Sequence, residues 1–188
     1  LLKPFLNINT DIISFNYSEV LLNGKKRKIT SKYTDDRITY DDYVINEKSL
    51  FLWKNIYNKK VIDLHNLKFI DKIKNIEDFH FNILFFLYAK KFKYINNYLY
   101  NYCYNPTSTS RDVSKKNLLK LAEDTKKVHT AINNNLTSKI SLSKREILGF
   151  LLNKSIVGFF YSLFKFNYSY LELKFYYKFY ESIKLFPT

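Results

Sequence analysis

Val20-Leu-Leu-Asn-Gly-Lys-Lys-Arg-Lys-Ile29 is the stretch that decides the predicted fold. Its apolar residues lead into Asn23-Gly24, a dipeptide typical of the tight turn of a β-hairpin. We expect the chain to fold back on itself here, with strands over 20–29 and 38–46 and a polar loop at 30–36. A short helix is expected before them, over 9–18, where Asn9 or Thr10 can act as the cap.

The cations after this turn form a candidate binding surface. Lys25, Lys26, Arg27 and Lys28 follow Gly24 directly. One interpretation is a solvated strand edge that charge keeps soluble. The other is contact with RNA, because the backbone amides of a tight turn can also approach a phosphate closely. The position of the cations beside the turn favours RNA.

Composition points to an anionic partner. The 188 residues carry a formal net charge of +14, and such an excess is usually compensated by nucleic acid or acidic lipid. Lys, Asn, Ile, Phe and Tyr are abundant while Gly and Pro are scarce, which indicates an A+T-rich coding sequence such as many organelle genomes carry. The sequence contains no Met, so we expect it to be processed or part of a longer chain. The single Cys103 excludes an internal disulfide and fits a reducing compartment.

The remaining sequence is predicted to be mostly helical. Residues 61–70 fit either a strand pair or a short helix. Apolar periodicity predicts helices over 76–98, from 112 or 114 to 133–135, and from a capping box at Ser143 to 164, with a linker at 105–110 and strand character over 168–186. We therefore expect an α+β fold with domains at 1–49, 50–166 and 167–188.

Catalytic and metal-binding motifs are missing from the sequence. The three histidines are scattered: we expect His80 on an apolar helix face and His129 on a polar one, and His65 has no Cys or second His at ligand spacing. Asp41 and Asp42 would point to opposite faces of a strand, which argues against an acid–base pair. We expect no catalytic residue, no metal and no cofactor.

Two further stretches have alternative interpretations. Residues 90–104 combine Lys with aromatic residues, and either stack on unpaired bases or form a helix end packed on protein. Residues 147–164 are the most apolar stretch, but Asn153-Lys154-Ser155 interrupts them, so we do not expect a membrane span.

At residues 9–49 the sequence resembles the RNA-binding module of the S-four family of small-subunit ribosomal proteins. Val20-Leu-Leu-Asn-Gly-Lys25 is similar to the first strand of that module, and Tyr40-Asp-Asp-Tyr-Val-Ile-Asn-Glu-Lys-Ser49 is similar to the second. Residues 168–188 resemble the family's C-terminal tail. Asp11, Ile12 and Ile13 stand where the family usually has Arg, and Tyr17-Ser-Glu19 replaces a His-Gly-His turn. A long insertion over 50–166 is similar to that of mitochondrial members.

The resemblance implies a structural, non-enzymatic role in translation. We expect a protein of the mitochondrial small ribosomal subunit, with a plastid-type organelle as the alternative location. The implied partners are small-subunit ribosomal RNA and neighbouring ribosomal proteins, including the fifth small-subunit protein. A separate polypeptide could supply the N-terminal domain, and no membrane is expected. The implied RNA-binding residues are Asn16, Tyr17, Ser18, Asn23, Gly24, Lys25, Lys26, Arg27, Lys28, Lys32 and Lys48.

Two rival functions are kept open. An RNA-modifying enzyme could use the module for targeting, but it needs a catalytic Asp that residues 50–166 do not identify. A basic subunit of an organellar membrane complex would place residues 147–164 in or on the bilayer.

Overall fold

The computed structural model of the chain has two compact units. It describes residues 9–31, 38–46, 51–108, 111–112, 114–135, 140–165 and 168–182. The first unit comprises residues 1–72 and 77–113, and the second comprises 73–76 and 114–188. The division between 113 and 114 lies just after the predicted linker at 105–110. The three-part division with boundaries after residues 49 and 166 remains a prediction.

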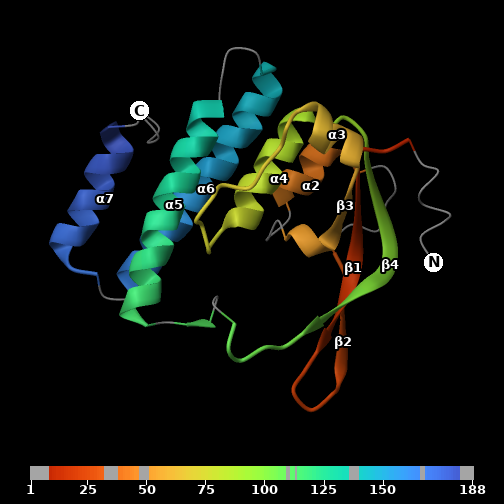
Figure 1. Cartoon of the computed structure of the whole chain (residues 1–188), viewed down its shortest axis with the longest axis horizontal. Coiled ribbons are helices and arrows are strands. Elements are labelled where there is room, and N and C mark those ends of the chain that lie inside the picture. The colour runs from red at the N-terminus through yellow and green to blue at the C-terminus, as the bar shows by residue number, and fades with distance from the viewer. Residues whose placement is uncertain are drawn as a thin grey trace. The chain divides into compact units, whose positions relative to one another are not determined.

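The first unit is organised around strand β1 (Ile12–Val20), which is hydrogen-bonded along both of its edges (Figure 1). Strand β4 (Phe92–Cys103) runs parallel to it along its whole length. On the other edge, β2 (Lys26–Ile29) pairs antiparallel with the end of β1, and β3 (Asn55–Tyr57) pairs antiparallel with its start. The coarse expectation of a mixed helix-and-sheet fold is therefore confirmed.

Helices of 3 to 12 residues complete the first unit. They are α2 (Tyr40–Asn46), the 3-10 helix η1 (Leu52–Lys54), α3 (Lys59–Leu64) and α4 (Glu77–Tyr88). Tyr40 and Tyr43 on α2 stack on Phe92 of β4, at centroid distances of 5.3 and 4.8 Å. Phe85 and Phe86 of α4 are fully buried. Aromatic packing between helices and sheet therefore forms much of this core.

The predicted hairpin is confirmed, but the helix before it is wrong. Val20 pairs with Lys26 across the turn, and Gly24 adopts a φ of 77°. The expected helix over 9–18 is instead β1. Asp11 lies just before β1, and its carboxylate accepts hydrogen bonds from the backbone amides of Lys90 and Lys91, at 2.7 and 3.0 Å. Pairing with β4, about 80 residues away, thus overrides the local helix signal.

The expected strand over 38–46 is also wrong, because these residues form α2. Thr39 and Asp42 form a reciprocal capping box at its start: Thr39 N–H donates to the Asp42 carboxylate at 3.3 Å, and Asp42 N–H donates to Thr39 Oγ1 at 3.1 Å. Asp41 and Asp42 thus occupy a first helical turn, where carboxylates are favourable.

Between residues 59 and 103 the structure decides between strand and helix for one segment and shortens one predicted helix. Of the two alternatives for residues 61–70, a strand pair or a short helix, the helix is present at their start, because α3 covers 59–64. The helix expected to reach residue 98 ends at Tyr88. Residues 92–103 form β4, so the interpretation of a helix end is wrong, whereas base stacking by the aromatic residues of this stretch stays a prediction.

The second unit consists of α5 (Lys115–Asn135), α6 (Leu142–Lys165) and α7 (Tyr170–Ser182). The two predicted helices are confirmed, with their apolar stripes inward: Ala122, Val128 and Ile132 of α5 are buried, as are Leu148 and Leu152 of α6. The cap of α6 is Ser141 rather than Ser143, since the Lys144 amide donates to Ser141 Oγ.

The strand predicted over 168–186 is wrong, because α7 occupies 170–182. Ser169 and Glu172 form a capping box there, with Ser169 N–H and Oγ donating to the Glu172 carboxylate at 2.8 and 2.7 Å. Tyr176 and Tyr180 are buried at helical spacing. The aromatic alternation that suggested a strand therefore belongs to a helix with one inward face.

Candidate active site around Asp78

Among the described carboxylates of the first unit, Asp78 is the one that best fits a catalytic role. It lies in the first turn of α4 and is partly buried. Its Oδ2 accepts a hydrogen bond from the backbone N–H of Leu52 at 3.1 Å. Burial raises the pKa of the Asp78 carboxyl above its ordinary value of 3.8, and the Leu52 hydrogen bond opposes this rise only in part. A carboxylate with a raised pKa is a candidate general base.

A chain of buried hydrogen bonds holds the first turns of α4 against the sheet. Ser14 Oγ of β1 donates to Tyr43 Oη at 2.9 Å, and Tyr43 Oη donates to Asn55 Oδ1 at 3.2 Å. Asn55 Nδ2 donates to Tyr57 Oη at 3.2 Å, and Tyr57 Oη donates to Asn82 Oδ1 at 2.7 Å.

This series of hydrogen bonds ends at the backbone of Asp78. Asn82 Nδ2 donates to the Asp78 carbonyl oxygen at 2.8 Å. The nearby Asp78 charge and, above all, burial raise the pKa of Tyr57, so its hydroxyl stays protonated. A network whose polar groups are satisfied in this way rigidifies the site.

Aromatic rings hold the segment that carries the Leu52 amide. Trp53 follows Leu52 directly and stacks on Phe51, Tyr100 and Tyr102, at centroid distances of 4.9, 4.9 and 5.1 Å. This packing holds η1 against β4. It therefore fixes the position of the Leu52 amide that binds the carboxylate.

Backbone strain lies directly before this helix. Ile76 adopts a φ of 54°, a left-handed conformation that is unusual for a β-branched residue. Such strain persists only where the surrounding structure over-determines it, and it occurs often at functional sites. The turn delivers Glu77 and Asp78 into the start of α4.

The sequence interpretation missed Asp78. Glu77-Asp78 forms an adjacent acidic pair at a predicted helix start, where it reads as ordinary favourable charge. A signal was available in the sequence: the acidic pair is followed by an apolar stretch. Such a stretch indicates a buried helix, and a carboxyl at the start of a buried helix is partly desolvated. That burial depends on β3 and η1, which no local pattern predicts.

The predicted RNA-binding residues fall into separate environments. Asn16 and Ser18 are buried in β1. Asn16 Oδ1 accepts hydrogen bonds from the Ser31 amide at 2.9 Å and from Tyr94 Oη, so Asn16 has a packing role within the sheet. Tyr17 packs edge-on against Trp53 at 4.8 Å.

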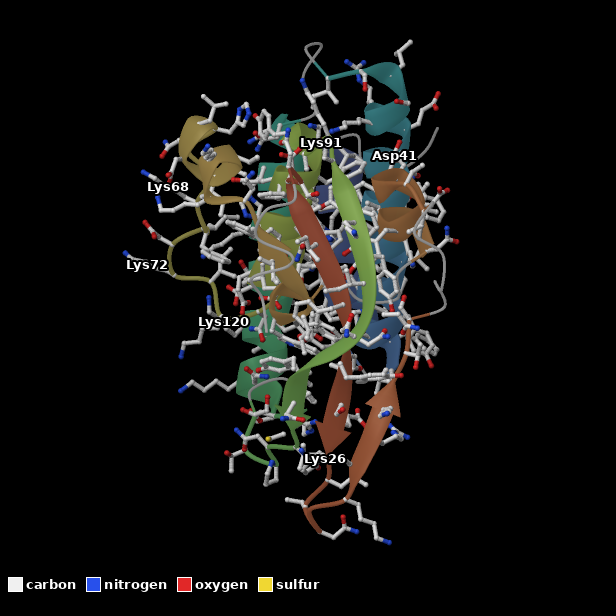
Figure 2. The ribbon with its side chains drawn as sticks, turned by 90° about the vertical axis from the view of Figure 1, so that its right-hand side faces the viewer. Lys26, Asp41, Lys68, Lys72, Lys91 and Lys120 are labelled. Atoms are coloured by element: carbon white, nitrogen blue, oxygen red, sulfur yellow. The ribbon has the colours of Figure 1, made fainter. Side chains whose placement is uncertain are left out.

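The hairpin residues are exposed. Asn23, Gly24, Lys25, Lys26, Arg27 and Lys28 lie at the outer end of β1 and β2. Arg27 pairs with Glu19 at 2.6 Å, and Lys28 lies over the Tyr98 ring at 5.0 Å. Figure 2 places Lys26 and Lys91 at opposite ends of the sheet. Lys32 and Lys48 lie outside the described residues.

The histidines and Cys103 carry no metal site in the part of the chain that the structure describes, where no cluster of three His, Cys, Asp or Glu occurs. His80 is buried on α4, as predicted. The prediction for His129 is wrong: it is fully buried and bonds Tyr180 Oη and Ser155 Oγ at 2.7 and 2.8 Å. Cys103 is exposed.

No protein-family model and no curated protein sequence matches the chain. Solved structures do match. The chain is similar to S. aureus TarS 1–349, with a TM-score of 0.60 and 17% identity over 91% of the chain. It is also similar to the same protein in complex with UDP, with a TM-score of 0.58 and 16% identity over 87% of the chain. The chain spans 47% and 44% of those two structures, and the likeness concerns the fold.

These comparisons overturn the ribosomal interpretation. TarS is a UDP-binding glycosyltransferase, and no comparison points to a ribosomal protein of the S-four family. The expectations of a structural ribosomal role and of a non-enzymatic protein are wrong, and so is that of an RNA-modifying enzyme. The physical reason is that the resemblance rested on two short strands and a tail. Residues 40–46 of the second strand and residues 170–182 of the tail form helices, so the backbone of the expected module is not formed there.

Proposed function

We propose that this chain is part of a glycosyltransferase that moves a sugar from a UDP-linked donor to a hydroxyl group of an acceptor. The observation that carries the proposal is the fold shared with a UDP complex over 87% of the chain. The site around Asp78 supports it independently, because sugar transfer to a hydroxyl requires a base and a partly desolvated carboxylate can serve as one.

In the proposed reaction Asp78 removes the proton of the acceptor hydroxyl. The acceptor oxygen forms a bond to the anomeric carbon of the donor sugar. The bond from that carbon to the diphosphate breaks, and UDP leaves with the electron pair. Asp78 is then a carboxylic acid, which returns its proton to solvent before the next cycle.

The surrounding residues have positioning roles in this proposal. The Leu52 amide binds one carboxylate oxygen of Asp78, and the Asn82 side chain binds the backbone carbonyl oxygen of Asp78. A second carboxylate oxygen remains to accept the proton. Packing of Trp53 against β4 keeps Leu52 in place. Substitution of these aromatic residues would therefore affect Asp78 through the hydrogen bond from the Leu52 amide.

Consumption of UDP-sugars by the purified protein tests the proposal. UDP release would be followed by a coupled assay across a panel of UDP-hexoses and UDP-N-acetylhexosamines, with and without hydroxyl acceptors such as oligosaccharides and polyol phosphates. We expect UDP release from at least one donor, stimulated by an acceptor, and binding of that donor by calorimetry. Failure to bind UDP or any member of the panel would contradict the proposed function.

A further inference from the structure

We infer that the outward face of α6 docks on the surface of an anionic lipid bilayer. This inference concerns the second unit alone and stands independently of the proposed transferase activity. Its starting point is that α6 is apolar on two opposite faces, whereas a surface helix of a water-soluble bundle normally presents a polar face to solvent.

The inward face of α6 is already occupied. Leu148, Leu151, Leu152, Ile156, Phe159 and Leu163 are buried within the helical unit. Phe159 packs edge-on against Tyr176 and Tyr180 of α7, at 5.3 and 5.8 Å, and Ser155 bonds His129 of α5. These contacts hold the helix in its bundle.

The outward face carries a second apolar strip. Phe150, Val157, Tyr161 and Phe164 recur at intervals of seven, four and three residues, which places them in one row on a helix. They are 51%, 69%, 68% and 74% exposed. Four large apolar side chains on one exposed helix face, with Lys154 between Phe150 and Val157, mark an interaction surface. We call this row the α6 strip.

The charge around the α6 strip selects lipid as the occupant. Lys154 and Lys165 flank the row on the same side of the helix and are exposed. Residues 73–76 and 114–188 carry 14 Lys or Arg and 5 Asp or Glu, so the second unit holds +9 of the total charge of +14. A basic rim around exposed Phe and Tyr fits a bilayer with acidic headgroups, because Lys reaches the headgroups while the rings enter the interface.

The same observations argue for a helix that lies on the membrane. Among the described helices α6 is the one long and apolar enough to cross a bilayer, by length and composition. Crossing would expose Lys154 to the hydrocarbon and would remove the inward residues from α5 and α7. Lying in the interface keeps the bundle intact and buries only the α6 strip.

Vesicle co-sedimentation of the purified chain tests this inference. We expect at least roughly tenfold stronger binding to vesicles with 30% phosphatidylglycerol than to pure phosphatidylcholine vesicles, and weaker binding as salt rises. The double variant V157S/F164S should reduce binding by roughly tenfold or more. The control L22S/L64S, which alters two exposed residues of the first unit, should leave binding unchanged.

A second pair of variants tests the charge. K154Q/K165Q should reduce binding to anionic vesicles by roughly tenfold, whereas the hairpin control K25Q/K26Q should change it far less. Unchanged far-ultraviolet circular dichroism would exclude misfolding as the cause. Equal losses in test and control variants would overturn the inference, and so would equal binding to neutral vesicles.

Two other occupants of the α6 strip give distinct results. A chain that stays with vesicles after alkaline carbonate and high salt would be a spanning protein. A dimer in sedimentation velocity that V157S/F164S converts to a monomer would assign the strip to a second copy. Either result would overturn the bilayer assignment.

Discussion

His129 is a buried titratable residue of the second unit whose environment makes stability depend on pH. It is fully buried between Tyr180 and Ser155, and burial lowers its pKa from 6.5 to about 4. The unfolded chain therefore binds a proton at a pH where the folded chain does not. The stability that the neutral His129 contributes is complete above pH 6.5 and is lost as pH falls toward 4.

Replacing His129 should remove this pH dependence. Between pH 7.5 and 5, the linkage predicts that the wild-type chain loses about 2 kcal/mol of unfolding free energy through this one group. H129Q should be less stable at pH 7.5 and should change less over the same interval, as measured by urea denaturation. The control H65Q alters an exposed histidine stacked on Tyr88 and should follow the wild type. Parallel pH profiles for wild type and H129Q would contradict this account.

Individual residues were predictable where a periodic pattern defined their surroundings. His80 was expected on an apolar helix face and is buried there. His129 was expected on a polar face, because the sequence of α5 alone does not reveal that α7 packs against it. Asp78 was missed for a related reason: its desolvation depends on η1 and β3, which come from elsewhere in the chain.

At the scale of elements, the β1–β2 hairpin depends on Gly24. Its φ of 77° lies in the left-handed region, where an L-residue is strained. We expect G24A to lower the unfolding free energy by about 1 kcal/mol. The matched change G158A, in the middle of α6, has no heavy atom within 4 Å of the new Cβ and should stabilise by up to about 1 kcal/mol. Urea denaturation measures both, and equal effects would contradict the turn geometry.

Elements were predicted well when their signals were local. The Asn23-Gly24 turn and the apolar stripes of α5 and α6 needed no distant partner, and all three are present. The stretches that became β1, α2 and α7 were assigned the wrong type. In β1 a distant partner strand decides, whereas in α2 and α7 side-chain caps at Thr39 and Ser169 outweigh an apparent alternation. Two-residue alternation over so short a span does not distinguish strand from helix.

For the whole molecule, the sequence predicted the class of fold but not its topology. The parallel pairing of β1 with β4 joins segments about 80 residues apart, and no motif marks it. The ribosomal resemblance depended on dipeptides such as Asn23-Gly24, which recur in unrelated hairpins. The net charge of +14 fits either nucleic acid or acidic lipid as a partner, and more than half of it belongs to the helical unit. The distribution of charge over the two units, rather than the net charge, is therefore needed to distinguish RNA from lipid as a partner.

The most direct test of the central claim is the turnover number for sugar transfer by D78N, measured at saturating UDP-sugar across a range of pH. Asn keeps the shape of Asp78 but cannot accept the proton, so we expect a loss of about 10²–10⁴ in kcat with little change in donor binding. The wild-type rate should rise with pH through the raised pKa of Asp78, and this limb should be missing in D78N. The control D63N removes an exposed carboxylate paired with Lys59 and should keep the wild-type rate. A D78N rate equal to that of the wild type, with the acid limb intact, would contradict the assignment of Asp78 as the base.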